Sequence, residues 1–139
     1  MPAASRSDAA DLPVRPGEEP WTAAELADVR AELEAEAARL HSDLAKAAAG
    51  VADRLTDLAR DAGDDEADVG AKAFEREHEL ALTQNAQDLL DQGERARHRI
   101  DAGTYGVCES CGKPIGKARL LAFPRATLCV ECKQRQERR

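Results

Sequence analysis

Apolar and small residues recur every three or four positions along two long stretches of the chain. The first stretch runs from Thr22 to about Asp61, and its mean step of about 3.5 residues is the period of a coiled-coil seam. Thr22 stands three residues before Glu25, the spacing of a capping box, so we expect a helix to begin there. The seam positions are Leu26, Val29, Leu33, Ala37, Leu40, Leu44, Ala47, Val51, Leu55 and Leu58.

A second stretch repeats the period from Phe74 to Ile100. Between the two stretches, residues 61–70 (DAGDDEADVG) combine two glycines with five acids, a composition typical of a connection between helices. Two long seams with a short link predict an antiparallel hairpin over residues 22–102, and pairing of the same seams between molecules is the competing arrangement. The second seam comprises Phe74, His78, Leu82, Ala86, Leu89, Gly93, Ala96 and Ile100.

Residues 1–21 show no such period. They hold four of the six prolines and few large apolar side chains, so their composition predicts a disordered N-terminal tail, with Trp21 as its anchor at the helix start. The segment lacks the apolar core of a secretion signal, and no apolar run approaches the roughly 18 residues that span a bilayer. We therefore expect a cytoplasmic protein with no membrane contact.

Composition supports an elongated helical protein. Leu, Ile, Val and Phe number 24 in 139 residues, about 17%, below the roughly 20% that is usual for a compact globule. With four aromatic residues in the chain, we do not expect base stacking on an aromatic platform.

Charge divides the chain into an acidic body and a basic end. The net charge is -7, but residues 103–139 carry eight Lys/Arg against three Asp/Glu, or +5, which leaves -12 for residues 1–102. The acidic body would repel nucleic acid, so no sequence-specific nucleic-acid contact is expected, whereas the basic end could meet an acidic surface.

Four cysteines supply the main chemical signal. Cys108, Cys111, Cys129 and Cys132 have the spacing C-x2-C-x17-C-x2-C, in which each close pair can present two sulfurs to one ion. The pattern favours one structural Zn²⁺, because four thiolates leave no open position for water or substrate. Disulfides, a dithiol redox site and an iron–sulfur cluster are the alternatives. The sequence thus predicts an all-α dominated fold: a long antiparallel coiled-coil hairpin, a small four-cysteine zinc-finger module at residues 103–139 and a short C-terminal helix.

Basic residues surround the cysteines. A solvated face that offsets the formal charge of a four-thiolate zinc centre is one interpretation, and a contact surface for a partner is the other. The candidate contact residues are Lys113, Lys117, Arg119, Arg125, Lys133 and Arg135.

Acidic residues gather in the predicted connection. Asp61, Asp64, Asp65, Glu66 and Asp68 could serve only solubility and helix capping. Carboxylates at the end of a stiff hairpin are also well placed to enter a cleft and meet a cation or a basic side chain.

The segment GTYGVCESCGKPIGKARLLAFPRATLCVEC resembles the zinc finger of the DksA/TraR family of bacterial transcription factors. The resemblance continues upstream to DEADVG, which is similar to the family's D-x-x-D-x-A tip, and so covers roughly residues 65–132. It implies a monomeric, non-enzymatic regulator that binds RNA polymerase directly and inserts its hairpin through the secondary channel. Asp65 and Asp68 would approach the catalytic centre and modulate initiation electrostatically.

Three positions depart from the family pattern. Gly70 stands where the family tip usually has alanine, so the conformation of the tip and the strength of regulation need not match those of the family. Gln92 and Phe123 stand where relatives that respond to guanosine tetraphosphate carry a lysine and an arginine, so that response does not carry over.

Three other functions compete with regulation of initiation. One is transcript cleavage stimulated through the same channel, for which the tip would have to hold a second magnesium ion at the polymerase centre. A zinc-dependent DNA-binding protein would use the basic end, and its DNA affinity would fall steeply with salt. A coiled-coil adaptor would leave the acidic residues facing solvent with no function of their own.

Overall fold

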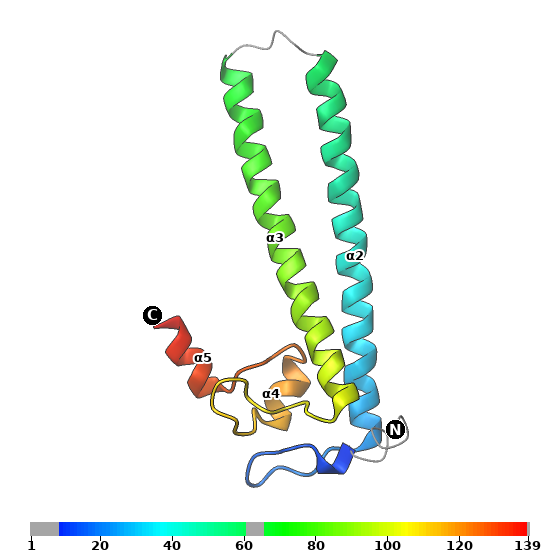
Figure 1. Cartoon of the computed structure of the whole chain (residues 1–139), viewed down its shortest axis with the longest axis vertical. Helices are drawn as coiled ribbons and strands as arrows, with labels where there is room; N and C mark the ends of the chain where they lie inside the picture. Colours follow the sequence, from blue (N-terminus) through cyan, green and yellow to red (C-terminus); the bar gives the residue numbers. More distant parts are fainter. Residues whose placement is uncertain (1–8, 61–65, 139) are drawn as a thin grey trace. The chain divides into compact units, whose positions relative to one another are not determined.

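The computed structural model describes residues 9–60 and 66–138. These residues form a short 3-10 helix, η1 (Ala9–Asp11), and four α-helices, α2 (Ala23–Arg60), α3 (Glu66–Ala102), α4 (Lys117–Ala122) and α5 (Val130–Glu137). Within the described ranges the β-type pairing is one isolated antiparallel bridge between Val107 and Pro114. The helical hairpin with a small cysteine-bearing module and short terminal helices is therefore confirmed (Figure 1).

The start of α2 follows the predicted capping box. The backbone N–H of Thr22 donates to Glu25 Oε1 at 3.0 Å, and the N–H of Glu25 donates to Thr22 Oγ1 at 3.1 Å. These reciprocal bonds satisfy two donors that a helix start would otherwise leave unpaired.

The start of α3 lies earlier than expected. Residues 66–70, which the sequence pattern assigned to the connection, are already helical, because α3 begins at Glu66. Acidic residues in a first helical turn interact favourably with the positive end of the helix dipole, so Glu66 and Asp68 support a helix start as well as a loop. The rest of the connection, residues 61–65, is outside the described residues.

The chain divides into two compact units. One, here called the cysteine unit, consists of residues 1–37 and 91–139; the other, the hairpin unit, consists of residues 38–90. Parts of α2 and α3 occur in each unit and run antiparallel there (Figure 1).

The buried core belongs almost wholly to the cysteine unit. Val29 and Leu33 from α2 and Ile100 from α3 pack in one cluster with three of the cysteines. Among the described residues of the hairpin unit, Leu90 alone is buried. The predicted seam is thus buried only where other elements cover it. The exposed seam positions among the described residues are Val51, Leu55, Phe74, His78 and Leu82.

Residues 9–21 correct the expectation of a disordered tail. Ala9, Leu12 and Trp21 are buried in the core of the cysteine unit, and the indole of Trp21 lies 6.0 Å from the Tyr105 ring between centroids. Composition under-rated the segment because its few apolar side chains all enter a core formed by residues far along the chain.

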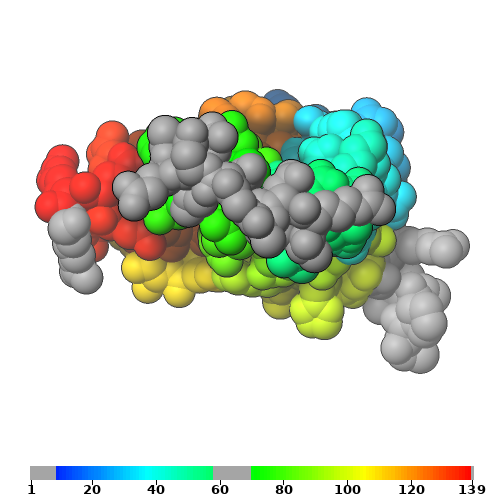
Figure 2. Space-filling model, turned by 90° about the horizontal axis from the view of Figure 1, so that it is seen from above, coloured from blue at the N-terminus to red at the C-terminus, as the bar shows by residue number. Residues whose placement is uncertain are grey.

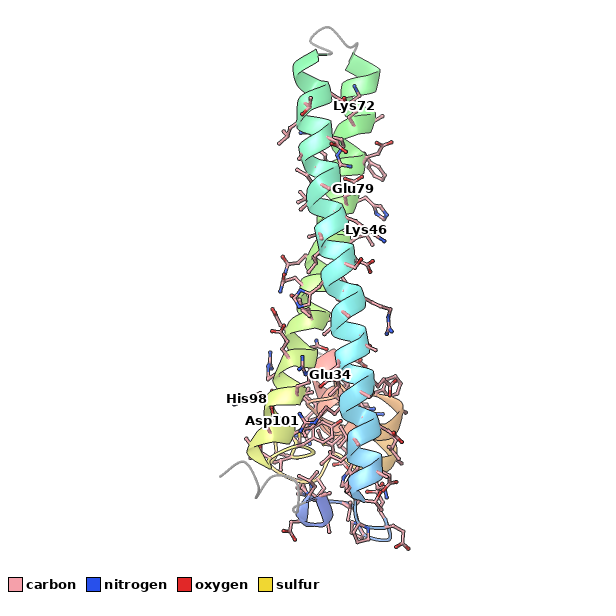
Figure 3. The ribbon with its side chains drawn as sticks, turned by 90° about the vertical axis from the view of Figure 1, so that its right-hand side faces the viewer. Glu34, Lys46, Lys72, Glu79, His98 and Asp101 are labelled. Carbon is pink, nitrogen blue, oxygen red and sulfur yellow. The ribbon has the colours of Figure 1, made fainter. Side chains whose placement is uncertain are left out.

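Ion pairs join α2 and α3 at their surfaces. In the cysteine unit, Arg30 lies 2.7 Å from Asp101 and Arg97 lies 3.7 Å from Glu34. In the hairpin unit, Arg54 pairs with Glu79. Figure 3 labels Glu34, Glu79 and Asp101 along the two helices. Exposed pairs of this kind contribute about 0–1 kcal/mol each, so they fix the register of the hairpin more than its stability.

None of the helices in residues 9–60 and 66–138 combines the length and the apolar character that crossing a bilayer requires.

Candidate metal centre and contact surfaces

The first cysteine pair sits on a tight hairpin that follows α3. The N–H of Cys108 donates to the Lys113 carbonyl at 2.9 Å, and the N–H of Gly112 donates to the Cys108 carbonyl at 3.0 Å. Gly112 has φ of 76°, a left-handed conformation that a glycine adopts without steric cost. This turn brings both sulfurs of the pair to one side.

The second cysteine pair sits at the start of α5. Cys129 is the N-cap residue of the helix, and Cys132 lies in its first turn. The backbone N–H of Cys129 points at Cys108 Sγ across 3.4 Å, which joins the two pairs. A helix start places the two sulfurs of a C-x2-C pair on the same face of the turn.

The four sulfur atoms form one cluster, and all lie within 4.8 Å of one another. None of the four cysteines is joined in a disulfide, and the sulfurs of Cys111 and Cys129 lie 3.8 Å apart. Zinc–sulfur bonds of about 2.3 Å in a tetrahedron separate the sulfurs by about 3.8 Å. The donor set and its spacing therefore fit a tetrahedral four-thiolate zinc site.

The pKa values of two thiols in the cluster are shifted in opposite directions. Burial raises the pKa of Cys108, but N–H groups of Cys111, Cys129 and Ser110 outweigh it and bring that pKa to about 6. The Ser110 hydroxyl lowers the pKa of Cys132, but the neighbouring thiols, Cys129 first, raise it to about 11. Crowding thus disfavours four thiolates together, and a central cation is what makes that state favourable.

Two side chains that sequence reasoning missed hold the backbone of the zinc module, one in the loop between the cysteine pairs and one just before the first pair. Tyr105 is 1% exposed, and its hydroxyl donates to the Pro124 carbonyl at 2.8 Å. The guanidinium of Arg99, on α3, donates to the Val107 carbonyl at 2.6 Å, just before the first cysteine. Neither residue lies on a seam position; the signal that could have found Tyr105 is its place beside Gly106 and the first cysteine pair.

Some of the predicted basic contact residues are paired with groups inside the cysteine unit, and the others are exposed. Lys117 is 12% exposed and its Nζ lies 2.7 Å from Glu25 Oε1, so it belongs to the internal framework of the unit. Arg125 is paired with Glu36 and reaches Gln92 at 3.5 Å. Arg119 donates to the Leu128 carbonyl at 3.3 Å and is half-buried. The exposed members of the set are Lys113, Lys133 and Arg135.

A polar groove of about 690 Å³ lies beside these side chains in the cysteine unit. Its lining includes Arg119, Arg125 and Lys133, and the Phe123 ring, which is 60% exposed, lies 5.8 Å from the Arg119 guanidinium carbon. Helix α5 borders the groove and is exposed along most of its length (Figure 2, red). The lining also holds Glu109 and Glu137, which pair with Arg95 and Lys133, so the groove presents charges of both signs.

The predicted acidic tip falls largely outside the described residues. Asp65 lies in the segment that the structure leaves undescribed, and Asp68 lies in the first turn of α3, where the backbone alone is described.

In the hairpin unit, α2 and α3 border an apolar groove of about 670 Å³, lined by Leu44, Val51 and Leu80 among others.

Comparison with known proteins gives consistent matches. Residues 103–138 match the family model described as the prokaryotic dksA/traR C4-type zinc finger. The "RNA polymerase-binding transcription factor DksA" of Escherichia coli strain K12 is 32% identical over 119 residues, 86% of this chain and 76% of that protein. The protein of the same name from Caulobacter vibrioides strain NA1000 is 41% identical over 75 residues, so the chain spans about half of it, 53%.

A solved structure, that of transcription factor DksA2 from Pseudomonas aeruginosa, matches with a TM-score of 0.64 and 36% identity. The match covers 83% of this chain and 84% of that one. Together, the C4-type match and the clustered cysteines point to one structural zinc ion.

Proposed function

The chain belongs to the DksA/TraR family of zinc-finger proteins, and we propose that it is a transcription regulator that binds RNA polymerase directly. The observation that carries the proposal is the alignment over 119 residues with a protein named for polymerase binding, because an alignment of this length cannot be confined to the cysteine module and must include the hairpin. The DNA-binding alternative would need only the basic module to be related.

The hairpin unit suits contact with a large partner. Its described residues bury little more than Leu90, while Leu55 and Phe74 are 62% and 73% exposed. Contiguous apolar surface left in solvent is typical of interaction sites, and the hairpin unit also has the apolar groove lined by Leu44, Val51 and Leu80. We therefore propose that the hairpin enters the polymerase secondary channel, where the enzyme would cover these side chains.

Two acidic residues at the start of α3 supply the proposed modulating groups: Asp65 directly precedes the helix in the chain, and Asp68 belongs to its first turn. Asp65 and Asp68 would act by their charge on a metal ion or basic group near the polymerase centre, with no covalent step. The zinc ion would hold the fold of the module and take no part in that interaction. The exposed cations of the module, Lys113, Lys133 and Arg135, would contact acidic polymerase surface.

A charge-matched substitution pair tests the proposal. Replacing Asp65 and Asp68 by asparagine should abolish the effect on the lifetime of initiation complexes while changing polymerase affinity less than about threefold, because neither group is needed for docking. The control replaces Asp28 and Asp43, which are exposed on α2, by asparagine and removes the same charge elsewhere. Equal transcription responses in both variants would contradict the tip mechanism.

Cross-linking tests binding separately from modulation. A photoreactive residue at position 65 or 68 should cross-link to polymerase near its catalytic centre, whereas one at position 28 should not. Absence of co-purification with polymerase would overturn the whole proposal, and cross-links confined to the outer surface of the enzyme would overturn channel insertion alone.

A further inference from the structure

One carboxylate joins the N-terminal segment to the loop between the two cysteine pairs. Glu18 Oε1 accepts hydrogen bonds from the N–H of Arg15 at 2.7 Å and of Lys117 at 2.9 Å. Glu18 Oε2 accepts one from the N–H of Ala118 at 2.9 Å. The two groups in α4 lie 99 and 100 residues along the chain from Glu18. Figure 1 shows the segment, in blue, beside α4.

The carboxylate is charged in the folded protein. Burial alone would raise the pKa of Glu18, but the N–H groups of Ala118, Arg15 and Lys117 together hold it below its ordinary value. Hydrogen bonds to a charged acceptor are stronger than neutral ones, and three of them converge here. Glu18 is therefore committed to this contact at neutral pH.

The side chain of Lys117, at the start of α4, also contacts the N-terminal segment. Its Nζ donates to the Pro20 carbonyl at 3.2 Å, pairs with Glu25 and lies 5.9 Å from the centre of the Trp21 ring. The N-terminal segment and the start of α4 thus hold each other through both backbone and side-chain groups.

The fit between the two segments is close. Gly116, directly before α4, has φ of 115°, and a Cβ at this position would meet Arg15 Cδ at 3.0 Å. Leu12 and Trp21 belong to the same buried cluster as Leu120 of α4 and three of the cysteines. The N-terminal segment therefore packs against the same hydrophobic core as the cysteines.

We propose that Glu18 is a positioning residue for the zinc module, and that residues 9–22, here called the strap, and the four cysteines stabilise each other through it. Helix α4 lies in the excursion between Cys111 and Cys129, so fixing α4 restricts the separation of the two cysteine pairs. When the loop between the cysteine pairs is held in place, the pairs separate less often and zinc is released more slowly. By linkage, zinc in turn stabilises the strap.

Zinc transfer tests the proposal on the whole zinc-loaded chain, without polymerase. Glu18→Gln keeps the shape of the side chain but turns an NH2 group toward N–H donors, so transfer of zinc to a chromogenic chelator should be about tenfold faster than in the wild type. Glu19→Gln is the matched control, because the neighbouring carboxylate is exposed. Equal transfer rates in Glu18→Gln and Glu19→Gln would overturn the proposal.

Two further measurements separate positioning from general destabilisation. In zinc-loaded Glu18→Gln, the amides of Lys117 and Ala118 should exchange with solvent about tenfold faster, while the amide of Leu33, which lies well inside α2, keeps its rate. Glu18→Asp retains the charge on a shorter side chain and should give a zinc-transfer rate between those of the wild type and Glu18→Gln. If Glu18→Gln does not fold, Glu18→Asp becomes the test variant. Faster transfer from Glu18→Asp than from Glu18→Gln, or uniform exchange changes, would contradict the role of the carboxylate.

Discussion

The cysteine unit and the hairpin unit share the same two helices but differ in what those helices contact. In the cysteine unit, Val29 and Leu33 of α2 are 1% and 2% exposed, because α3, the strap and the zinc module surround them. In the hairpin unit, Leu55 of the same helix is 62% exposed. The same apolar period is therefore a core in one unit and a surface in the other.

The cysteine unit therefore supplies most of the stability of the fold, whereas the hairpin unit supplies exposed surface. Burial of apolar side chains and the metal site, the two largest stabilising contributions available to a chain with few large apolar residues, both lie in the cysteine unit. The hairpin unit is left with helix propensity and exposed ion pairs, which contribute little. Its surface is correspondingly free to meet a partner.

Zinc removal should produce the largest contrast between the units. A chelator, or Cys129→Ser, removes metal binding worth on the order of 10 kcal/mol at neutral pH, so the cysteine unit should lose its fixed packing. The emission of Trp21, the single tryptophan, should shift to the red as it becomes solvated, while much of the helical circular dichroism remains. Restoring zinc to the chelated wild type is the control. Unchanged Trp21 emission after verified zinc loss would refute this assignment of stability.

A pair of leucine substitutions should show the next largest contrast. Leu33→Ala removes a side chain that is 2% exposed and should lower the free energy of unfolding by about 2–5 kcal/mol. Leu82→Ala, at a position 56% exposed, should change it by less than about 0.5 kcal/mol. Urea unfolding of both variants measures the difference, and similar losses would mean that the hairpin unit has a core of its own.

Tyr105 provides a smaller, pH-dependent effect in the cysteine unit. Burial, with a contribution from Glu32, raises the pKa of Tyr105 above its ordinary value. Because the folded pKa is the higher one, the stabilisation is complete below about pH 10 and is lost as pH rises toward the folded pKa. Tyr105→Phe should cost about 1–2 kcal/mol at neutral pH through its hydrogen bond to Pro124.

The same variant should lose less stability between about pH 9.5 and pH 11.5 than the wild type does, because it has no phenol to ionise. Urea unfolding at several pH values measures both effects. Parallel pH profiles for the two proteins would show that Tyr105 does not contribute to alkaline unfolding.

Sequence patterns predicted much of the candidate site and part of the fold. The four cysteines were found from spacing alone, because two ligands on one turn are a local property of the chain. The helix start at Thr22 was found for the same reason, since its hydrogen bonds join residues three apart. The role of Lys117 was not foreseen: its charge suggested a contact surface, but the structure pairs it with Glu25.

The sequence by itself determined the helical period, the helix cap and the spacing of the cysteines, all of which depend on residues close together in the chain. Tertiary structure alone decided which part of the seam is buried, and that residues 9–21 pack into the core instead of forming a tail. It also decided that Glu18 meets α4 across about a hundred residues. Burial and pairing of this kind depend on which distant segments cover a side chain, and local composition carries no record of that.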